Sequence, residues 1–536
     1  MHELLIKGGT LVDGTGAPGL ARDVAVDGAR ISAIYREGEG KGAMSIDARS
    51  LVVCPGFIDI HAHSDLYLLC CPLAESKIRQ GVTTELLGNC GGSAAPMIAA
   101  AREAEAKSAE YLGVTIDWSS IDEYLLRLAD LKTSVNVATL VGADTLRLAV
   151  LGSDDVQPTD EQLTLMNDLL KEAMLQGAFG VSTGLIYAPG CYAHTEEIIS
   201  LARTSAAMGG FYASHIRNES SRVVSAVEEA IRIGRESGSR VQISHHKACG
   251  RRNWGLVDQT LKMIDDARAS GVDVAMDVYP YTASSTGLDV VLPPWAREGT
   301  KDVVASRLKD PSTRERIKAE WTDPGTSWEN TVFEDGWDLI VVGSFSQKGN
   351  TRFENRSLAD IAKELGKPAP DAALDLLVEE QMSIGAVFHE MSEDDVIKVM
   401  QHPVSCIASD GESEAPYGPT GHVATHPRSY GTFPRVLRRY VFEKRALSLE
   451  AAIKKMTSMP AERMGLKDRG IIAKGMAADI VIFDPRSVRD VATFEDSHRY
   501  AEGIRHVLVN GQLTVKDGEH TRERAGQVIR HVPTGT

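Results

Sequence analysis

Eight short apolar segments, separated by stretches with helical periodicity, constrain the fold of this 536-residue chain more than any other feature. We expect strands in LVVCPGFIDIHAH, TTELLGNC, SVNVATLVGA, FGVSTGLIY, GFYASHIR, RVQISHHK, VDVAMDVYPY and PVSCIASDG. Stretches such as SSRVVSAVEEAIRIGRESG carry apolar residues at helical spacing between them. Strands that alternate with helices are typical of parallel βα units. Eight such units predict an α/β fold, a TIM-like (β/α)8 barrel.

The two ends of the chain have a different pattern from the middle. Residues 1–54 and 469–536 alternate apolar and polar residues, with Gly and Asp at the breaks. This pattern is typical of short antiparallel strands joined by tight turns. We predict that both ends build one small β-sandwich domain. Two unrelated terminal hairpins are the alternative.

The spacing of the strands fails in one place, between the seventh and the eighth. More than a hundred residues separate Tyr281 from Val404, and residues 289–355 are rich in charge, Trp and Gly. We predict a small inserted subdomain there, so that the barrel comprises residues 55–288 and 356–468. An open doubly wound sheet is the structural alternative. No G-x-G-x-x-G follows an early strand, which weakens a dinucleotide-binding version of that sheet.

Composition narrows the classes of partner. The formal net charge of −16 disfavours binding to phosphate backbones and anionic lipid. There is no apolar run of eighteen residues, and the N-terminal sequence lacks the pattern of a signal peptide. Seven cysteines in so long a chain do not make a disulfide framework. We expect a cytoplasmic protein that acts on a small molecule, without a nucleic-acid or membrane partner.

Side chains with metal-binding atoms stand at the carboxyl ends of the predicted strands. In a barrel these ends form one rim, where the active sites of this fold lie. His61 and His63 alternate on the first strand and therefore point the same way. Other candidates end strands two, five, six and eight: Cys90, His215, His245 or His246, and Asp410. Cys and His together favour zinc over magnesium or calcium.

Each candidate also has a structural explanation when it is taken alone. An isolated H-x-H is common by chance, and a lone cysteine is more often an inert core residue. Either histidine at 245–246 could hydrogen-bond to backbone, and Asp410 before Gly411 could open a turn. Their shared position at strand ends favours metal binding.

A metal-assisted hydrolase also needs a carboxylate that moves the proton of the attacking water. Asp410 is the strand-end carboxylate free for that role. The chain has no G-x-S-x-G elbow, so a serine nucleophile has little support.

Several segments together resemble the D-aminoacylases, the N-acyl-D-amino-acid deacylases of the amidohydrolase superfamily. The resemblance covers nearly the whole chain, from IKGGTLVDGTG and PGFIDIHAHSD to KGMAADIVIFDP. Its most specific parts are the cysteine of GNCG, the segment SHHK and the segment HPRSYGTFPR. The strand-four lysine that many superfamily members carbamylate is missing from GVSTGLIY, which fits the cysteine-containing subgroup.

The resemblance implies roles for individual residues. A tightly held zinc would lie on Cys90, His215 and His245, with a second, weaker metal site near His61 and His63. His245 rather than His246 is implied because the first histidine of the pattern S-H-x-K is the ligand. Asp410 would be the catalytic acid/base. The residues implied to bind the substrate carboxylate are Lys247, Tyr279 and Arg428, helped by Tyr187 and Ser285.

The resemblance implies hydrolysis of an N-acyl-D-amino acid to a carboxylate and a free D-amino acid. A cyclic-amide hydrolase of the hydantoinase or dihydroorotase type, or a dipeptidase acting on a D-residue, is the alternative within the same class. A non-catalytic barrel scaffold is the rival from another class. The loop ESEAPYGPTGHVAT after Asp410 is longer than the family pattern, which puts the side-chain preference in doubt.

Overall fold

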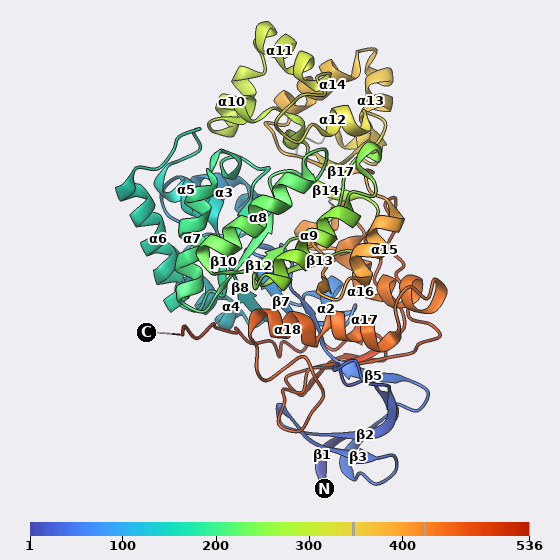
Figure 1. Cartoon of the computed structure of the whole chain (residues 1–536). Coiled ribbons are helices and arrows are strands. Elements are labelled where there is room, and N and C mark those ends of the chain that lie inside the picture. The colour runs from blue at the N-terminus through green and yellow to red at the C-terminus, as the bar shows by residue number, and fades with distance from the viewer. Residues whose placement is uncertain (346–348, 423, 535–536) are drawn as a thin grey trace.

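The computed structural model of the chain describes residues 1–345, 349–422 and 424–534. The predicted insert and the C-terminal segment each include a few residues outside these ranges. From bottom to top in Figure 1, a terminal β module, a barrel and an inserted subdomain follow one another. Among the described helices, none is long and apolar enough to span a membrane.

A ring of eight parallel strand segments among the described residues confirms the predicted barrel. The strands in order are β6 (Phe57–Asp59), β7 (Val82–Leu87), β8 (Asn136–Thr139) with its continuation β9 (Val141–Gly142), β10 (Gly180–Gly184), β11 (Phe211–His215), β12 (Arg240–Ile243), β13 (Val274–Val278) and β18 (Ser405–Ile407). The ring closes between its first and last strands. There the backbone N–H of Asp410 donates to His61 O at 2.9 Å, and that of His63 donates to Gly411 O at 3.1 Å.

Helices cover the outer face of the ring, which explains why its strands are apolar throughout. Both faces of β11 and β13 are buried, as parallel strands in a barrel require. Helix α8 (Val223–Ser237) buries Val223, Val227 and Ile231 at helical spacing and ends at Gly238, whose φ is 75°. The other helices of this part are α1 (Tyr67–Cys70), α2 (Glu75–Ile78), α3 (Ala99–Tyr111), α4 (Ile121–Leu131), α5 (Ala143–Val150), α6 (Asp160–Leu175), α7 (Thr195–Ala207), α9 (Val257–Ala269), α15 (Glu393–Gln401), α16 (Arg428–Arg435), α17 (Leu449–Met456) and α18 (Ser458–Met464).

Both ends of the chain contribute to a single nine-stranded sheet. Its strands are β1 (His2–Leu11), β2 (Leu20–Asp27), β3 (Arg30–Arg36), β4 (Gly42–Asp47), β5 (Val52–Pro55), β19 (Ile480–Phe483), β20 (Ile504–Val509), β21 (Gln512–Lys516) and β22 (Glu519–His520). The antiparallel pair β5–β19 joins the two ends, with Val53 opposite Ile482. The chain then enters the barrel at Gly56, where a Cβ atom would lie 2.1 Å from Thr83 Oγ1. The segment expected as one first strand is therefore divided between the module and the barrel.

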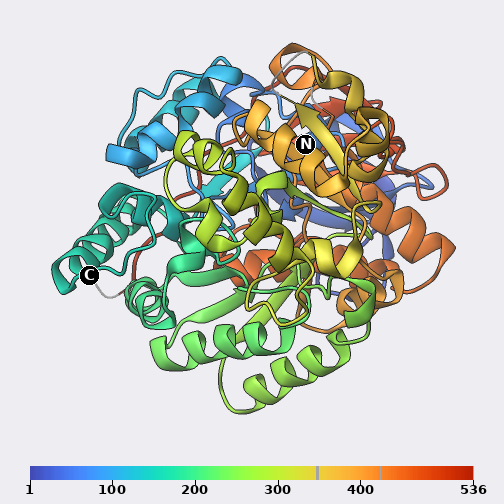
Figure 2. The same cartoon turned by 90° about the horizontal axis from the view of Figure 1, so that it is seen from above.

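The inserted subdomain stands over the mouth of the barrel (Figures 1 and 2). Its sheet has the order β14 (Ser284–Gly287), β17 (Ile384–Phe388), β15 (Ile340–Phe345) and β16 (Arg356–Ser357), with antiparallel pairs. Its helices are α10 (Lys301–Arg307), α11 (Pro311–Trp321), α12 (Thr331–Asp335), α13 (Leu358–Leu365) and α14 (Ala369–Glu379).

The insert extends past residue 355, where the sequence analysis placed its end. Apart from Ile186 of the barrel, the buried members of its hydrophobic cluster lie between Leu288 and Phe388 and include Leu358 on α13 and Leu374 on α14. The physical reason is β17, which returns between β14 and β15 and draws both helices onto this sheet rather than onto the barrel. The segment 356–388, assigned to the barrel above, belongs to the cluster of the insert.

Candidate metal centre

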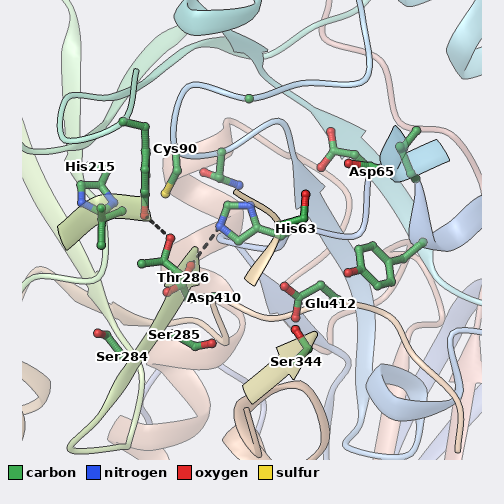
Figure 3. A pocket seen from close by; sticks show the side chains of 18 of the residues that line it. His63, Asp65, Cys90, His215, Ser284, Ser285, Thr286, Ser344, Asp410 and Glu412 are labelled. Carbon is green, nitrogen blue, oxygen red and sulfur yellow. Dashed lines mark hydrogen bonds and ion pairs between the residues drawn. The ribbon is translucent and has the colours of Figure 1, made fainter. Parts of the chain in front are cut away.

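The strand ends bring the candidate ligands to one point above the barrel core. Atoms of His61, Cys90, His245 and Asp410 that can bind a metal all lie within 4.8 Å of one another. His245 also belongs to a second such group, with His215 and Glu219. Figure 3 shows Cys90, His63 and Asp410 turned toward the same space, with His215 beside Cys90. The strand ends predicted to meet at one rim thus bring sulfur, nitrogen and oxygen donors close together.

Three of these residues adopt a backbone conformation that usually favours glycine. The φ angles of Cys90, His245 and Asp410 are 50°, 33° and 55°. For a residue with a Cβ atom, the left-handed region costs about 1–2 kcal/mol. Strained positions of this kind cluster at functional sites, because the side chain is needed there. The backbone turns sharply after these strands and directs each side chain inward.

Two carboxylates hold the histidines from behind, and the sequence analysis missed both. Asp277 Oδ1 lies 3.2 Å from His61 Nδ1 and accepts the backbone N–H of His245 at 2.7 Å. Glu219 Oε1 lies 3.0 Å from His245 Nδ1. Such partners orient a metal-binding imidazole and make it a better ligand. Two signals could have found them: Asp277 is an acid inside the apolar strand VAMDV, and Glu219 follows His215 by four residues.

The structure separates the two adjacent histidines. His246 Nε2 lies 2.7 Å from Thr260 Oγ1 of α9, on the outside of the barrel wall. His245 instead faces the cavity, with its Nε2 3.5 Å from Cys90 Sγ. This geometry supports His245 as the ligand of the pair.

The donor set fits zinc. Neither ring nitrogen of the buried His215 has a hydrogen-bond partner among the described residues, as expected for a histidine whose partner is a metal. Burial alone would raise the pKa of Cys90, but the charges of His61 and His245 hold it well below its usual value. A thiolate with imidazoles is a set that zinc prefers, and such a set can leave a position open for water.

Asp410 joins the donor set to the substrate cavity. Its Oδ1 lies 3.0 Å from His63 Nε2 and 3.2 Å from His61 Nε2, and its Oδ2 accepts from Arg428 Nη1 at 2.6 Å. Burial opposes its ionisation, but the charges of Arg428, His245 and His61 hold the pKa of Asp410 well below its usual range. With its two oxygens held by His63 and Arg428, Asp410 is the carboxylate positioned to exchange a proton in the cavity.

One cavity of about 1050 Å³ opens above the metal-binding atoms. All five residues expected to bind the substrate carboxylate line it: Tyr187, Lys247, Tyr279, Ser285 and Arg428. Lys247 Nζ is 2.7 Å from Glu219 Oε2, and Arg428 Nη2 donates to Ser285 O at 3.0 Å. Both cations already have partners, so an incoming carboxylate would share them.

The same cavity has acidic residues that the sequence analysis did not assign. They come from the first barrel loop, the insert and the loop after β18: Asp65, Glu329, Glu390, Glu412 and Glu414. The insert residue Glu329 accepts the backbone N–H of Glu219, behind the histidines. The insert and the long loop therefore shape the part of the cavity farther from the strands.

Comparisons with known proteins agree with this geometry. The amidohydrolase family model matches residues 358–515. An N-acyl-D-aspartate deacylase of Alcaligenes xylosoxydans xylosoxydans is 38% identical over 531 residues, which cover 98% of this chain and 95% of the relative. A solved D-aminoacylase, described by its binuclear metal centre, has a TM-score of 0.83 at 35% identity and matches over 99% of this chain and 100% of its own.

A second solved structure supports the prediction of a zinc cofactor. An N-acyl-D-glutamate deacylase from Bordetella bronchiseptica, complexed with zinc and a phosphonate inhibitor that mimics the tetrahedral intermediate, has a TM-score of 0.82. Its identity is 36%, and the match covers 99% of this chain and 100% of that chain. Together with the geometry of the donors, the comparisons confirm the predicted fold, family and zinc chemistry. This chain belongs to the N-acyl-D-amino-acid deacylase family of the amidohydrolases.

Proposed function

We propose that this chain uses zinc to hydrolyse the amide bond of N-acyl-D-amino acids, releasing a carboxylate and a free D-amino acid. One observation carries the proposal: the metal-binding group of His61, Cys90, His245 and Asp410 adjoins the same cavity as two buried cations. The metal-binding group suits amide hydrolysis, and the two cations suit a substrate with a free carboxylate. Membership of the deacylase family supports both parts.

The donors suggest how a metal would be held. Cys90, His215 and His245 would hold the tight zinc, and His61 with His63 would complete a second, weaker site beside Asp410. The chemistry that zinc supplies in such a site is a water of lowered pKa and a polarised carbonyl.

Asp410 is proposed to move the proton. As an ionised carboxylate it takes a proton from the attacking water and delivers it to the leaving nitrogen. His63 and Arg428 hold its two oxygens, at 3.0 Å and 2.6 Å, and so fix its orientation. The amine then leaves in neutral form, which makes the cleavage of the C–N bond easier.

The cations are proposed to bind the substrate carboxylate. Arginine presents two parallel N–H groups that match two carboxylate oxygens. The Arg428 guanidinium lies 5.5 Å from the centre of the Tyr279 ring and Lys247 Nζ lies 5.6 Å from it, so both charges lie near one aromatic side chain. Tyr187 and Ser285 would add contacts from the same cavity. A ring amide such as a hydantoin has no free carboxylate to place there.

A substrate panel tests this function. Release of free amine is measured from N-acetyl-D-methionine, its L enantiomer, its primary amide, a dipeptide ending in a D-residue, and a hydantoin. We expect cleavage of the D substrate, with the L enantiomer slower by about 10²-fold because its amide is misplaced. Faster opening of the hydantoin, or faster cleavage of the dipeptide, would replace this function with that alternative.

We also propose a cytoplasmic protein that acts on a small-molecule substrate and binds neither nucleic acid nor membranes. All seven cysteines, each within the described residues, are free thiols, as in a reducing compartment. The net charge of −16 disfavours nucleic acid and anionic membranes. Fractionation of the source cells, followed by immunodetection, tests the location.

A further inference from the structure

The long loop after β18 forms a fixed wall of the cavity. The backbone N–H of Ser413 donates to Ser64 Oγ at 2.8 Å, and that of Glu414 donates to Ser76 Oγ at 2.8 Å. These bonds attach the loop to the segment that follows the first barrel strand. The side chains of Glu412 and Glu414 both line the cavity as a result.

Glu414 is buried without a full set of partners. It is 3% exposed, and its Oε2 has no hydrogen-bond partner among the described residues. Burial and the charge of Glu412 raise the pKa of Glu414 well above its usual value, although a hydrogen bond from Thr425 opposes part of this rise. Its ionised form is therefore disfavoured until a cation lies beside it. A buried carboxylate oxygen without a partner costs free energy in the folded protein. Its position in the cavity wall indicates that a ligand supplies the partner.

No described lysine or arginine forms an ion pair with these two carboxylates, although the charges of Lys77 and Arg428 act on them. Within the described ranges, neither Glu412 nor Glu414 makes an ion pair, and Glu412 Oε2 accepts only from the hydroxyl of Ser429, at 2.8 Å. Lys77 is bound to Asp59 at 2.7 Å, and Arg428 is bound to Asp410. Because both cations form their ion pairs with other carboxylates, this wall remains acidic toward the cavity.

An aromatic ring completes the wall. Tyr67, at the start of α1, lines the same cavity. Glu412 and Glu414 line that cavity as well, so an aromatic ring and two acidic side chains share one wall. Such a wall suits an ammonium or a guanidinium group.

We propose that Glu412, Glu414 and Tyr67 form a subsite for a cationic group of the substrate, an ammonium or a guanidinium. The proposal rests on the proposed deacylase function and names its substrate class. In the view of Figure 3, Glu412 lies on the side of His63 away from Cys90 and His215. The cation belongs either to the side chain of the D-residue or to the acyl group. The same wall repels carboxylates, so N-acyl-D-aspartate and N-acyl-D-glutamate are poor substrates.

Matched substrate pairs test the subsite and distinguish the two sources of the cation. The first pair is N-acetyl-D-lysine against N-acetyl-D-norleucine, and the second is N-(6-aminohexanoyl)-D-alanine against N-hexanoyl-D-alanine. In the wild-type holoenzyme we expect kcat/KM to favour the cationic member of one pair by about tenfold or more, the worth of a charged hydrogen bond. The pair that shows the preference identifies which part of the substrate reaches the wall.

The variants are Glu414→Gln and Glu412→Gln, each of which keeps the size of the side chain and removes the charge. In each variant the cationic preference should fall to about threefold or less, while N-acetyl-D-glutamate improves relative to wild type. The second variant keeps the proposal testable where the first fails to fold. Glu103→Gln, at an exposed position on α3 that does not line the cavity, makes the same charge change and should keep the wild-type ratios.

Two results would overturn the proposed subsite, and only the second would also overturn the deacylase function. Cleavage of the neutral N-acyl-D substrates without a cationic preference in either pair, or a preference that both variants retain, removes the subsite and leaves the deacylase function standing. Failure to cleave any N-acyl-D substrate, charged or neutral, removes the proposed function and the subsite with it.

Discussion

The barrel rim and the inserted subdomain meet at one cavity, but they contribute to it in different ways. Rim residues follow strands that are hydrogen-bonded on both sides, and His61, His215 and His245 are at most 4% exposed. The insert packs around a second hydrophobic cluster, which Ile186 of the barrel joins, and reaches the cavity through an edge strand and loops, with Ser285 and Glu329. A rim held by strand pairing suits chemistry, and an insert whose side chains line the cavity beyond the ligands suits contacts with the substrate. We therefore expect rim substitutions to change metal binding and turnover, and insert substitutions to change substrate affinity.

The largest effect is expected at the rim, for Asp410→Asn. This change keeps the size of the side chain and removes the proton acceptor. The turnover number should fall by about 10²–10⁴-fold, the usual contribution of a general acid–base group, with zinc content retained. Steady-state kinetics and elemental analysis of the same preparation provide the two numbers. Near-normal turnover would exclude Asp410 as the proton acceptor. It would also remove the expected difference in catalytic effect between the rim and the insert.

Closure of the rim is expected to depend on a buried lysine. Lys77 Nζ donates to Asp59 Oδ2 at 2.7 Å, to Ser409 Oγ at 2.6 Å and to Gly411 O at 2.9 Å, so it joins the first strand to both neighbours of Asp410. Lys77→Met would leave Asp59 buried without its cation. The free energy of unfolding should fall by about 3–5 kcal/mol, measured by denaturant titration.

The matched control for Lys77→Met is Lys262→Met on α9. Its ion pair with Asp266 is exposed, at 73% and 66% for the two side chains, and should contribute less than about 1 kcal/mol. Equal losses of stability in the two variants would contradict the role of Lys77 in closing the ring.

Metal affinity is expected to depend on a residue behind the ligands. Glu219→Gln would weaken the contact to His245 Nδ1 and should lower zinc affinity by about 10–100-fold. Added zinc should restore turnover, which separates this effect from a loss of fold. Competition with a metal chelator measures the affinity. Glu228→Gln, at an exposed position on α8, is the matched control, and an equal affinity in both variants would show that Glu219 has no part in the site.

The smallest effect is expected in the insert, for Ser285→Ala. The contact that this residue makes to Arg428 uses its backbone oxygen, which alanine also has. At most one neutral hydrogen bond to the substrate is lost, worth about 0.5–1.5 kcal/mol, so KM should rise by about 2–13-fold with turnover retained. Steady-state kinetics on N-acetyl-D-methionine measure KM and the turnover number. A loss of turnover as large as that of Asp410→Asn would end the contrast between rim and insert.

The rim could be predicted from the sequence, and the extent of the insert could not. The rim was predictable because strand ends are local features: Cys90 and Asp410 each follow an apolar run, and the barrel brings such ends together. The extent of the insert was not, because the amphipathic pattern of α13 and α14 does not say which sheet a helix covers. Asp277 was missed for a similar reason, since its role depends on histidines from two other strands.

The central claim is that a thiolate from the second barrel strand helps to hold the zinc on which hydrolysis depends. It is tested most directly by Cys90→Ala, with zinc content and kcat/KM on N-acetyl-D-methionine measured on one preparation. Cys191→Ala, which removes a cysteine outside this cavity, is the control. We predict about one zinc per chain in the wild type and in the control, and a marked loss of both zinc and activity in Cys90→Ala. Unchanged zinc and activity in Cys90→Ala would contradict the account.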